Sequence, residues 1–209
     1  MSRLFEKPSE SLTARDVACS ALLPPEFSFE QRRTLLLIAH QSILSGLDHQ
    51  PLSEAPPSPA GLSDPRGVFT TLYLWGQLRG CVGYAVPVEP LYRAVAETAR
   101  AAAFEDSRFS PVTAEDALNL EVSLSVLSRL FPIHPTAVEV GRHGLVISDG
   151  ARRGLLLPQV PVEHGWDRET FLEQTCRKAG LPLDAWSQGA TIEAFTAEIF
   201  SDAAVGAAC

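Results

Sequence analysis

A guanidinium, a thiol and two glycines lie within six consecutive residues of this 209-residue chain. The run Leu78–Gly83 reads LRGCVG and interrupts an otherwise apolar strand pattern. Because glycine removes the side chain that a strand would pack, Gly80 and Gly83 predict a bulge or the close approach of another backbone or a ligand. If the strand is regular, Arg79 and Cys81 share one face, where a neighbouring cation would favour the reactive thiolate.

Two interpretations of Cys81 follow. The thiol could serve as a nucleophile or carrier, with Gly80 and Gly83 letting a substrate come close. Alternatively, Cys81 is a small packed side chain and the glycines serve the hairpin, since unpaired cysteine is among the most buried residue types.

Arg79 and Arg108 are candidates for binding an anionic small molecule. Guanidinium groups present paired donors that match a carboxylate or a phosphate, and a local ligand would explain two such groups on an acidic protein. The alternative is structural: Arg108 pairs with Asp106 or Glu105 and fixes its own loop.

His143 lies in a glycine-flanked turn, residues 141–144, and is a candidate base or ligand. A solvated or carbonyl-bonded turn histidine is the alternative. Other histidines share no ligand spacing with it, and the four cysteines form no C-x-x-C pair, so no metal site is predicted. Dinucleotide and P-loop motifs are absent too, and no cofactor is predicted.

Composition points to an ordinary soluble protein. The chain is 45% hydrophobic and 20% charged, with a formal net charge of −8, which argues against general nucleic-acid or anionic-membrane binding. The sequence shows neither the apolar core of a signal peptide nor a run of ~20 apolar residues, and scattered cysteines fit a reducing compartment. We therefore expect a cytoplasmic protein.

Hydrophobic periodicity predicts the first half of the fold. Ser28 with Gln31 forms a capping box before a helical apolar stripe. Residues 68–74 and 78–85 read as a hairpin around a turn at 75–77, which places the LRGCVG run on its second strand. A small-residue helix follows from position 90, and strict alternation over 120–126 predicts a half-buried strand.

The second half contains further hairpins. Asp149-Gly150 is the preferred signal for a two-residue type I′ turn, Asp167 is a candidate helix N-cap, and one last strand is expected over 191–200. Hairpins interspersed with helices predict an α+β fold with antiparallel sheet. Residues 1–26 read as a leader or arm, and the proline-rich stretch 51–66 as an extended connection.

Several blocks together resemble the AMMECR domain family, over about residues 27–200. The resemblance is carried by LRGCVG and by the blocks that follow it in family order: Asp106–Phe109, His143-Gly144, Leu157–Val160, Trp166-Asp167 and Lys178–Leu181. Two mild departures are Val82, where many relatives have isoleucine, and Ser107, where many have proline. Residues 201–209 are expected to form a tail.

The resemblance implies a larger and a smaller lobe and no settled reaction. Prokaryotic members are similar to component A of the AmmeMemoRadiSam group, associated with a MEMO-type protein and a radical S-adenosylmethionine enzyme. One hypothesis is therefore an accessory or catalytic component of a modification pathway, with Cys81 and His143 as catalytic candidates and Arg79, Arg108, Gly80 and Gly83 around the substrate. The other is a non-catalytic adaptor that recognises a protein partner by a pocket or a sheet edge.

Overall fold

The computed structural model of this chain describes residues 25–52 and 61–206. Most of the predicted leader, the central part of the proline-rich connection and the last three residues of the expected tail lie outside the described residues. Cys19 and Cys209 lie outside them as well. No helix in the described ranges is both long and apolar enough to cross a membrane.

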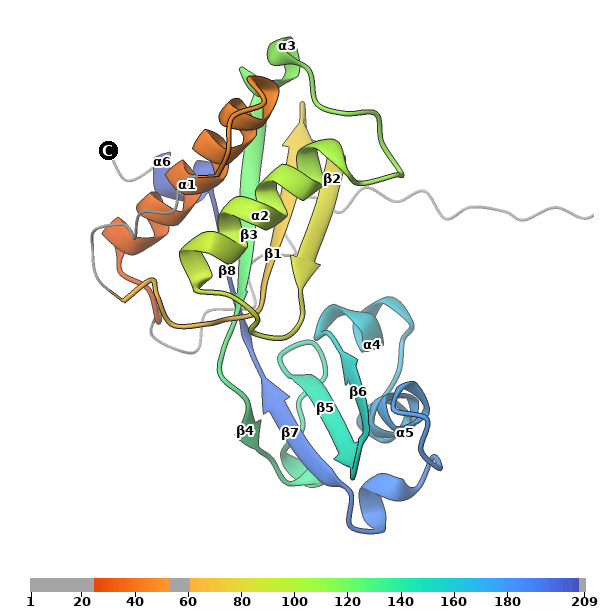
Figure 1. Cartoon of the computed structure of the whole chain (residues 1–209). Coiled ribbons are helices and arrows are strands. Elements are labelled where there is room, and N and C mark those ends of the chain that lie inside the picture. The colour runs from red at the N-terminus through yellow and green to blue at the C-terminus, as the bar shows by residue number, and fades with distance from the viewer. Residues whose placement is uncertain (1–24, 53–60, 207–209) are drawn as a thin grey trace, which may run out of the picture.

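Two antiparallel sheets, each with its own helices, build a larger and a smaller lobe (Figure 1), which confirms the predicted α+β class. The sheet of the larger lobe has the order β2-β1-β3-β8, and that of the smaller lobe β4-β7-β5-β6. The larger lobe comprises α1 (Phe29–Leu47), β1 (Val68–Leu74), β2 (Gln77–Tyr84), α2 (Leu91–Phe104), α3 (Ala114–Ala117), β3 (Leu120–Leu127), β8 (Ala197–Ser201) and α6 (Asp202–Gly206). The smaller lobe comprises β4 (Phe131–Pro132), β5 (Gly144–Asp149), β6 (Arg152–Leu156), α4 (Gln159–Glu163), α5 (Arg168–Lys178) and β7 (Thr191–Phe195), with 3-10 turns at Pro135–Ala137 and Ala185–Ser187.

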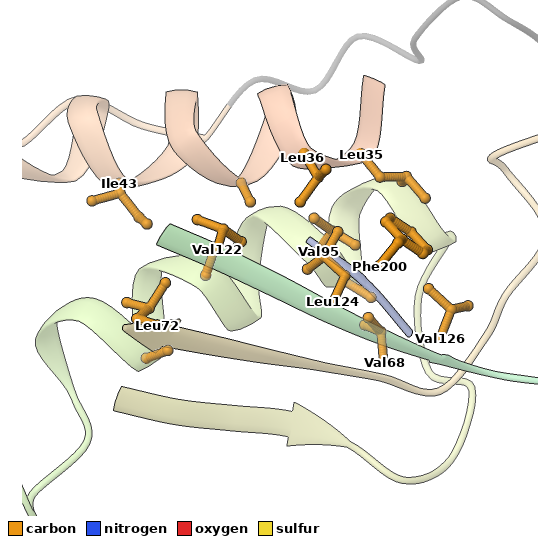
Figure 2. Packing of buried hydrophobic residues seen from close by; sticks show 14 of the residues in the cluster. Leu35, Leu36, Ile43, Val68, Leu72, Val95, Val122, Leu124, Val126 and Phe200 are labelled. Atoms are coloured by element: carbon orange, nitrogen blue, oxygen red, sulfur yellow. The ribbon is translucent and has the colours of Figure 1, made fainter. Parts of the chain in front are cut away.

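Helices α1 and α2 cover one face of the larger sheet (Figure 2). The predicted capping box is present, because Ser28 accepts from the Gln31 amide and the Gln31 side chain accepts from the Ser28 amide. In β1 and β3 the buried residues alternate with half-buried ones, so the second face of the sheet stays partly exposed. Thr70 of β1 and Thr98 of α2 are fully buried polar residues. Their hydroxyl groups lie 2.8 Å apart and form a hydrogen bond, so neither is left without a partner.

The β1–β2 hairpin carries the LRGCVG run, as predicted. Its two-residue turn, Trp75-Gly76, has positive φ at both positions, 54° and 75°, which is the type I′ geometry. The register then shifts, because Leu72 pairs with Gly80 and Tyr73 pairs with Leu78. Arg79 is therefore the extra residue of a β-bulge, and the regular strand that would place it beside the Cys81 side chain is absent.

The turn of the β5–β6 hairpin differs by one residue from the prediction. Asp149 pairs with Arg152, so the two turn residues are Gly150 and Ala151, and only the glycine has a positive φ, 58°. Type I′ geometry needs positive φ at both positions, which the Cβ of Ala151 disfavours. The predicted N-cap of α5 is present, since Asp167 accepts from the Thr170 amide at 2.8 Å.

The expected single strand over 191–200 is wrong, because the chain changes sheets at Thr196. Strand β7 pairs in the smaller lobe and β8 in the larger lobe. The chain also passes between the lobes at Ser128, which follows β3, and the two passages are hydrogen-bonded to each other. The Ser128 amide donates to the Thr196 carbonyl at 2.8 Å, and the Thr196 amide donates to the Ser128 hydroxyl at 3.0 Å. A small apolar cluster of Leu127, Val146 and Phe195 joins the lobes at this point.

Candidate functional site

At Gly80 the backbone of helix α2 lies close to β2. A Cβ at Gly80 would collide with the carbonyl oxygen of Ala102 in α2 and lie 3.0 Å from its carbonyl carbon. A Cβ at Gly83 would lie 2.5 Å from the Val68 carbonyl oxygen and would also collide with the Phe69 ring. Both glycines therefore permit close approaches, as the sequence suggested, and the approaching groups belong to the protein itself.

Arg79 holds the segment that leads from α2 to β3. Its guanidinium donates to the carbonyl oxygens of Ser110 and Pro111, the latter at 3.1 Å, and to the Asp116 carboxylate at 3.3 Å. The side chain is only 17% exposed. Three oxygen partners on one guanidinium satisfy most of its donors, so this candidate anion-binding residue is engaged within the protein.

Asp106 and Arg108 fix the backbone of Cys81 at the outer edge of β2. The Cys81 amide donates to the Asp106 carboxylate at 2.9 Å, and the Arg108 guanidinium donates to the Cys81 carbonyl oxygen at 3.1 Å. Arg108 also donates to both Asp106 oxygens, at 2.9 and 2.7 Å. The predicted alternative for Arg108, a pair with Asp106 that fixes the loop, is present, and it also occupies the hydrogen-bonding groups of an edge strand.

The electrostatics of this pair follow from its burial. The Asp106 side chain is 6% exposed, and the hydrogen bonds from Arg108, followed by the bond from the Cys81 amide, hold the pKa of its carboxyl far below the usual range. The same contact raises the pKa of Arg108. Arg108 itself is 57% exposed and packs over the Phe109 ring at 5.4 Å, so part of its guanidinium faces solvent.

The Cys81 thiol lies on the partly exposed face of the larger sheet. Cys81 is opposite Thr71, and the Thr71 hydroxyl donates to Sγ at 3.3 Å. This pair makes no ladder hydrogen bonds of its own, which is the arrangement that brings opposing side chains closest. Tyr73 lies on the same face: burial raises the pKa of its phenol, and the charges of Cys81 and Glu121 raise it further.

The sheet register extends this site into a row of small polar groups. Thr71 is paired with Cys81 on one side and with Ser123 on the other, and Ser123 is paired with Ser201. All four side chains are partly exposed. The sequence revealed Cys81 but not this row, because alternation shows which residues share a face and only the register shows which of them are neighbours.

His143 lies in the smaller lobe and takes part in its own turn. The residue is 6% exposed, its Nδ1 accepts from the Glu139 amide at 3.0 Å, and its amide donates to the Glu139 carbonyl oxygen at 3.0 Å. Desolvation, together with the charge of Arg142, lowers the pKa of the imidazole. No hydrogen bond or ion pair in the described ranges connects it to Arg79, Cys81 or Arg108.

The structure thus brings Arg108 and Cys81 together, through the Cys81 backbone, and directs Arg79 to the 110–116 segment. None of the predicted site residues lines the cavity beside α1 and α2 or the cavity at the lobe junction. No group of three or more histidine, cysteine, aspartate or glutamate side chains within residues 25–52 and 61–206 is arranged to hold a metal ion.

The comparisons with known proteins agree with this fold. The AMMECR1 family profile matches residues 36–200, and the chain belongs to this family. It is 46% identical over 165 residues to a protein of Thermococcus gammatolerans, covering 73% of this chain and 79% of that protein. It is 38% identical to a protein of Methanopyrus kandleri, covering 85% and 91% of the two chains. The crystal structure of an uncharacterized protein from Pyrococcus horikoshii aligns with a TM-score of 0.62 at 42% identity, covering 80% of this chain and 89% of that one.

Proposed function

We propose that this AMMECR1-family protein is an accessory or catalytic component of a modification pathway that includes a MEMO-type protein and a radical S-adenosylmethionine enzyme. The partners follow from the family resemblance. The observation that carries a chemical role is the Cys81 thiol, which is partly exposed, hydrogen-bonded by Thr71 and fixed in place through its own backbone.

The thiol would carry an acyl group. Attack of Sγ on an acyl carbon forms a sulfur–carbon bond, breaks the bond to the donor's leaving group and transfers the thiol proton to that group or to water. The Thr71 hydroxyl is the one side chain in the described ranges that is hydrogen-bonded to Sγ, so a proton acceptor would come from the donor, the solvent or a partner protein. A donated hydrogen bond stabilises the thiolate relative to the thiol.

An anionic part of the substrate would meet Arg108 rather than Arg79. Arg108 is more than half exposed and its Nη2 already lies beside the Cys81 carbonyl, whereas Arg79 is mostly buried and bound to three oxygens. Gly83 follows Cys81 by two residues on the same strand, but the Phe69 ring occupies the space that a side chain at Gly83 would fill, so the substrate would approach Sγ from the side of Arg108.

The adaptor hypothesis is the second candidate, because the charged residues around Cys81 hold the hairpin and its loop together. Asp106 and Arg108 occupy the amide and carbonyl of Cys81, so strand addition by a partner is blocked at this point of the β2 edge. An adaptor would instead use the partly exposed sheet face around Thr71 and Tyr73.

Reconstitution of the pathway with its MEMO-type and radical enzymes separates the two. We expect Cys81→Ser to abolish product formation and to leave the melting temperature within a few degrees of wild type, while the neighbouring Ser123→Ala retains activity. A Cys81→Ser protein with full activity would reject the thiol role. Loss of partner binding by Tyr73→Ala together with full activity of Cys81→Ser would establish the adaptor role in its place.

A further inference from the structure

A cavity of about 450 Å³ lies where the two lobes meet, away from the LRGCVG site. Its wall combines the segment before β1, the segment that follows β2, the link from β3 to β4, and strands β6 and β7. The volume is within the range of small-molecule sites, which commonly lie between structural units. Ala85, Val86 and Pro87 follow β2, but no residue of the Leu78–Gly83 run contributes to the wall.

The cavity is basic although the protein is acidic. Its charged lining residues are Arg66, Arg129 and Arg153, and no aspartate or glutamate lines it. The chain as a whole has 25 acidic and 17 basic residues. A concentration of one charge sign against the overall charge is a feature of sites that attract an oppositely charged ligand.

The three guanidinium groups are neutralised only in part. Arg129 is 73% exposed and binds Asp64 at 2.6 Å, and Arg66 is held by Glu26 and the Leu127 carbonyl oxygen. The Arg66 side chain is 10% exposed, and its buried Nε has no hydrogen-bond partner among the described residues. Arg153 is exposed and has no hydrogen bond or ion pair to any described residue. Three cations thus face two carboxylates, and one buried donor is unsatisfied.

Apart from Ser128, the remaining side chains of the wall are apolar and accommodate a non-polar group next to the cations. Val86 and Pro87 follow β2, Leu130 follows β3, and Leu155 and Phe195 belong to β6 and β7. Val86 is 43% exposed, which leaves apolar surface open to a ligand. A few polar groups that converge on an apolar wall are typical of small-molecule sites.

We propose that this junction cavity binds a small organic anion, a phosphate or carboxylate carried on a compact apolar body. The anionic head lies between Arg153 and Arg129, because these two guanidinium groups are accessible, and the body rests on Val86, Leu130 and Leu155. Residues of both lobes line the cavity, so an occupied site ties the lobes together and stabilises the folded protein.

Titration calorimetry with 1-naphthyl phosphate tests this site on the full chain. We expect saturable binding and a ligand-dependent rise in melting temperature, whereas 1-naphthol, which lacks the charge, and inorganic phosphate, which lacks the apolar body, bind at least about tenfold more weakly. Arg153→Gln and Arg129→Gln each weaken binding by about tenfold, because each removes a charge-assisted hydrogen bond. The matched control is Arg142→Gln, which removes an exposed arginine outside the cavity and leaves the affinity within about twofold.

Three results would overturn the proposal. These are no saturable binding at millimolar concentration, equal binding of 1-naphthol and 1-naphthyl phosphate, or an affinity that both cavity variants leave unchanged. Activity in the reconstituted pathway plays no part in this readout, so failure of the Cys81 proposal would leave the result interpretable.

Discussion

The hairpin β1–β2 in the larger lobe and the hairpin β5–β6 in the smaller lobe share one structural feature, a glycine in the edge strand, but the arginines beside these glycines make different contacts. In each, a glycine of the edge strand lets a helix backbone come close: Gly80 faces Ala102 of α2, and Gly154 faces Ala179 at the end of α5. The arginines that precede the two glycines differ in strand register and in hydrogen bonding. Arg79 is bulged out of register and bound to three oxygens, whereas Arg153 stays in register opposite Ser148 and has no hydrogen-bond or ion-pair partner among the described residues.

The two arginines therefore have different roles: Arg79 is bound within the protein and stabilises it, whereas the Arg153 guanidinium is accessible to a ligand. In the larger lobe the charged residues stabilise the hairpin and its loop, and the group to which our proposal assigns chemistry is the Cys81 thiol. In the smaller lobe the same local pattern leaves a guanidinium free to meet a ligand. An arginine beside a strand glycine therefore indicates packing of a helix in both places, and only the tertiary contacts decide whether its charge is available.

The largest expected effect comes from adding a Cβ to either hairpin glycine. Gly80→Ala and Gly154→Ala should each lower the free energy of unfolding by about 3 kcal/mol or more, because backbone atoms of a packed helix must move. Thermal and denaturant unfolding measure this. Gly76→Ala is the control: a Cβ there meets nothing within 4 Å, and only the positive φ of 75° opposes it, at about 1 kcal/mol.

Wild-type stability of Gly80→Ala would contradict the claim that Gly80 is needed for the packing of α2. Wild-type stability of Gly154→Ala would contradict the same claim for Gly154 and α5. An effect no larger than that of Gly76→Ala would mean that the helices give way at low cost.

The second effect tests the support of β2 by its loop. Asp106→Asn should cost about 2 kcal/mol at neutral pH, because a nearly buried carboxylate loses its charge-assisted bonds to Arg108 and the Cys81 amide. Since folding lowers the pKa of this carboxyl, its contribution is complete above the usual value of 3.8 and is lost as the pH falls below it. Urea unfolding of both proteins over this pH range measures the difference.

The difference in the free energy of unfolding between wild type and Asp106→Asn should therefore become smaller at acidic pH. Glu139→Gln, which breaks the exposed pair with Arg142, is the matched control and should cost no more than about 0.5 kcal/mol. If this difference stays constant down to the lowest accessible pH, the charge of the Asp106 carboxylate does not contribute to the stability of the protein.

The third effect compares the two arginines directly. Arg79→Gln should lower the free energy of unfolding by about 1.5 kcal/mol, because two backbone carbonyls and Asp116 lose their donor. Arg153→Gln should change it by less than about 0.5 kcal/mol, since the side chain is exposed and makes no such bonds. Equal losses in the two variants would remove the distinction between a supporting and an available arginine.

Local patterns predicted most of the elements. The capping box at Ser28, the alternation of β3 and the N-cap at Asp167 each depend on residues a few positions apart, and each appears as expected. The change of sheets at Thr196 was missed because an apolar pattern continues through it, and the break depends on hydrogen bonds to Ser128, which is 68 residues away.

The candidate site was predictable in residue type and not in arrangement. Gly80 stands out in the sequence because glycine is unusual inside a strand, and Cys81 stands out because its thiol follows that glycine directly. The partners of Cys81 are Thr71, Asp106 and Arg108, which lie 10 to 27 positions away and reach it only through the register of the sheet and the path of the loop. Periodicity carries no information on such distant contacts.

Alkylation of the folded protein tests the availability of the Cys81 thiol most directly. Cys176 provides the internal reference, because it is fully buried and burial raises the pKa of its thiol. With iodoacetamide at neutral pH and site-resolved mass spectrometry, we expect Cys81 to react at least about tenfold faster than Cys176. Thr71→Val should slow Cys81 by roughly two- to tenfold, because the thiolate loses a hydrogen bond. Labelling of Cys81 only after denaturation, at the rate of Cys176, would contradict the account and leave the thiol as a packing residue.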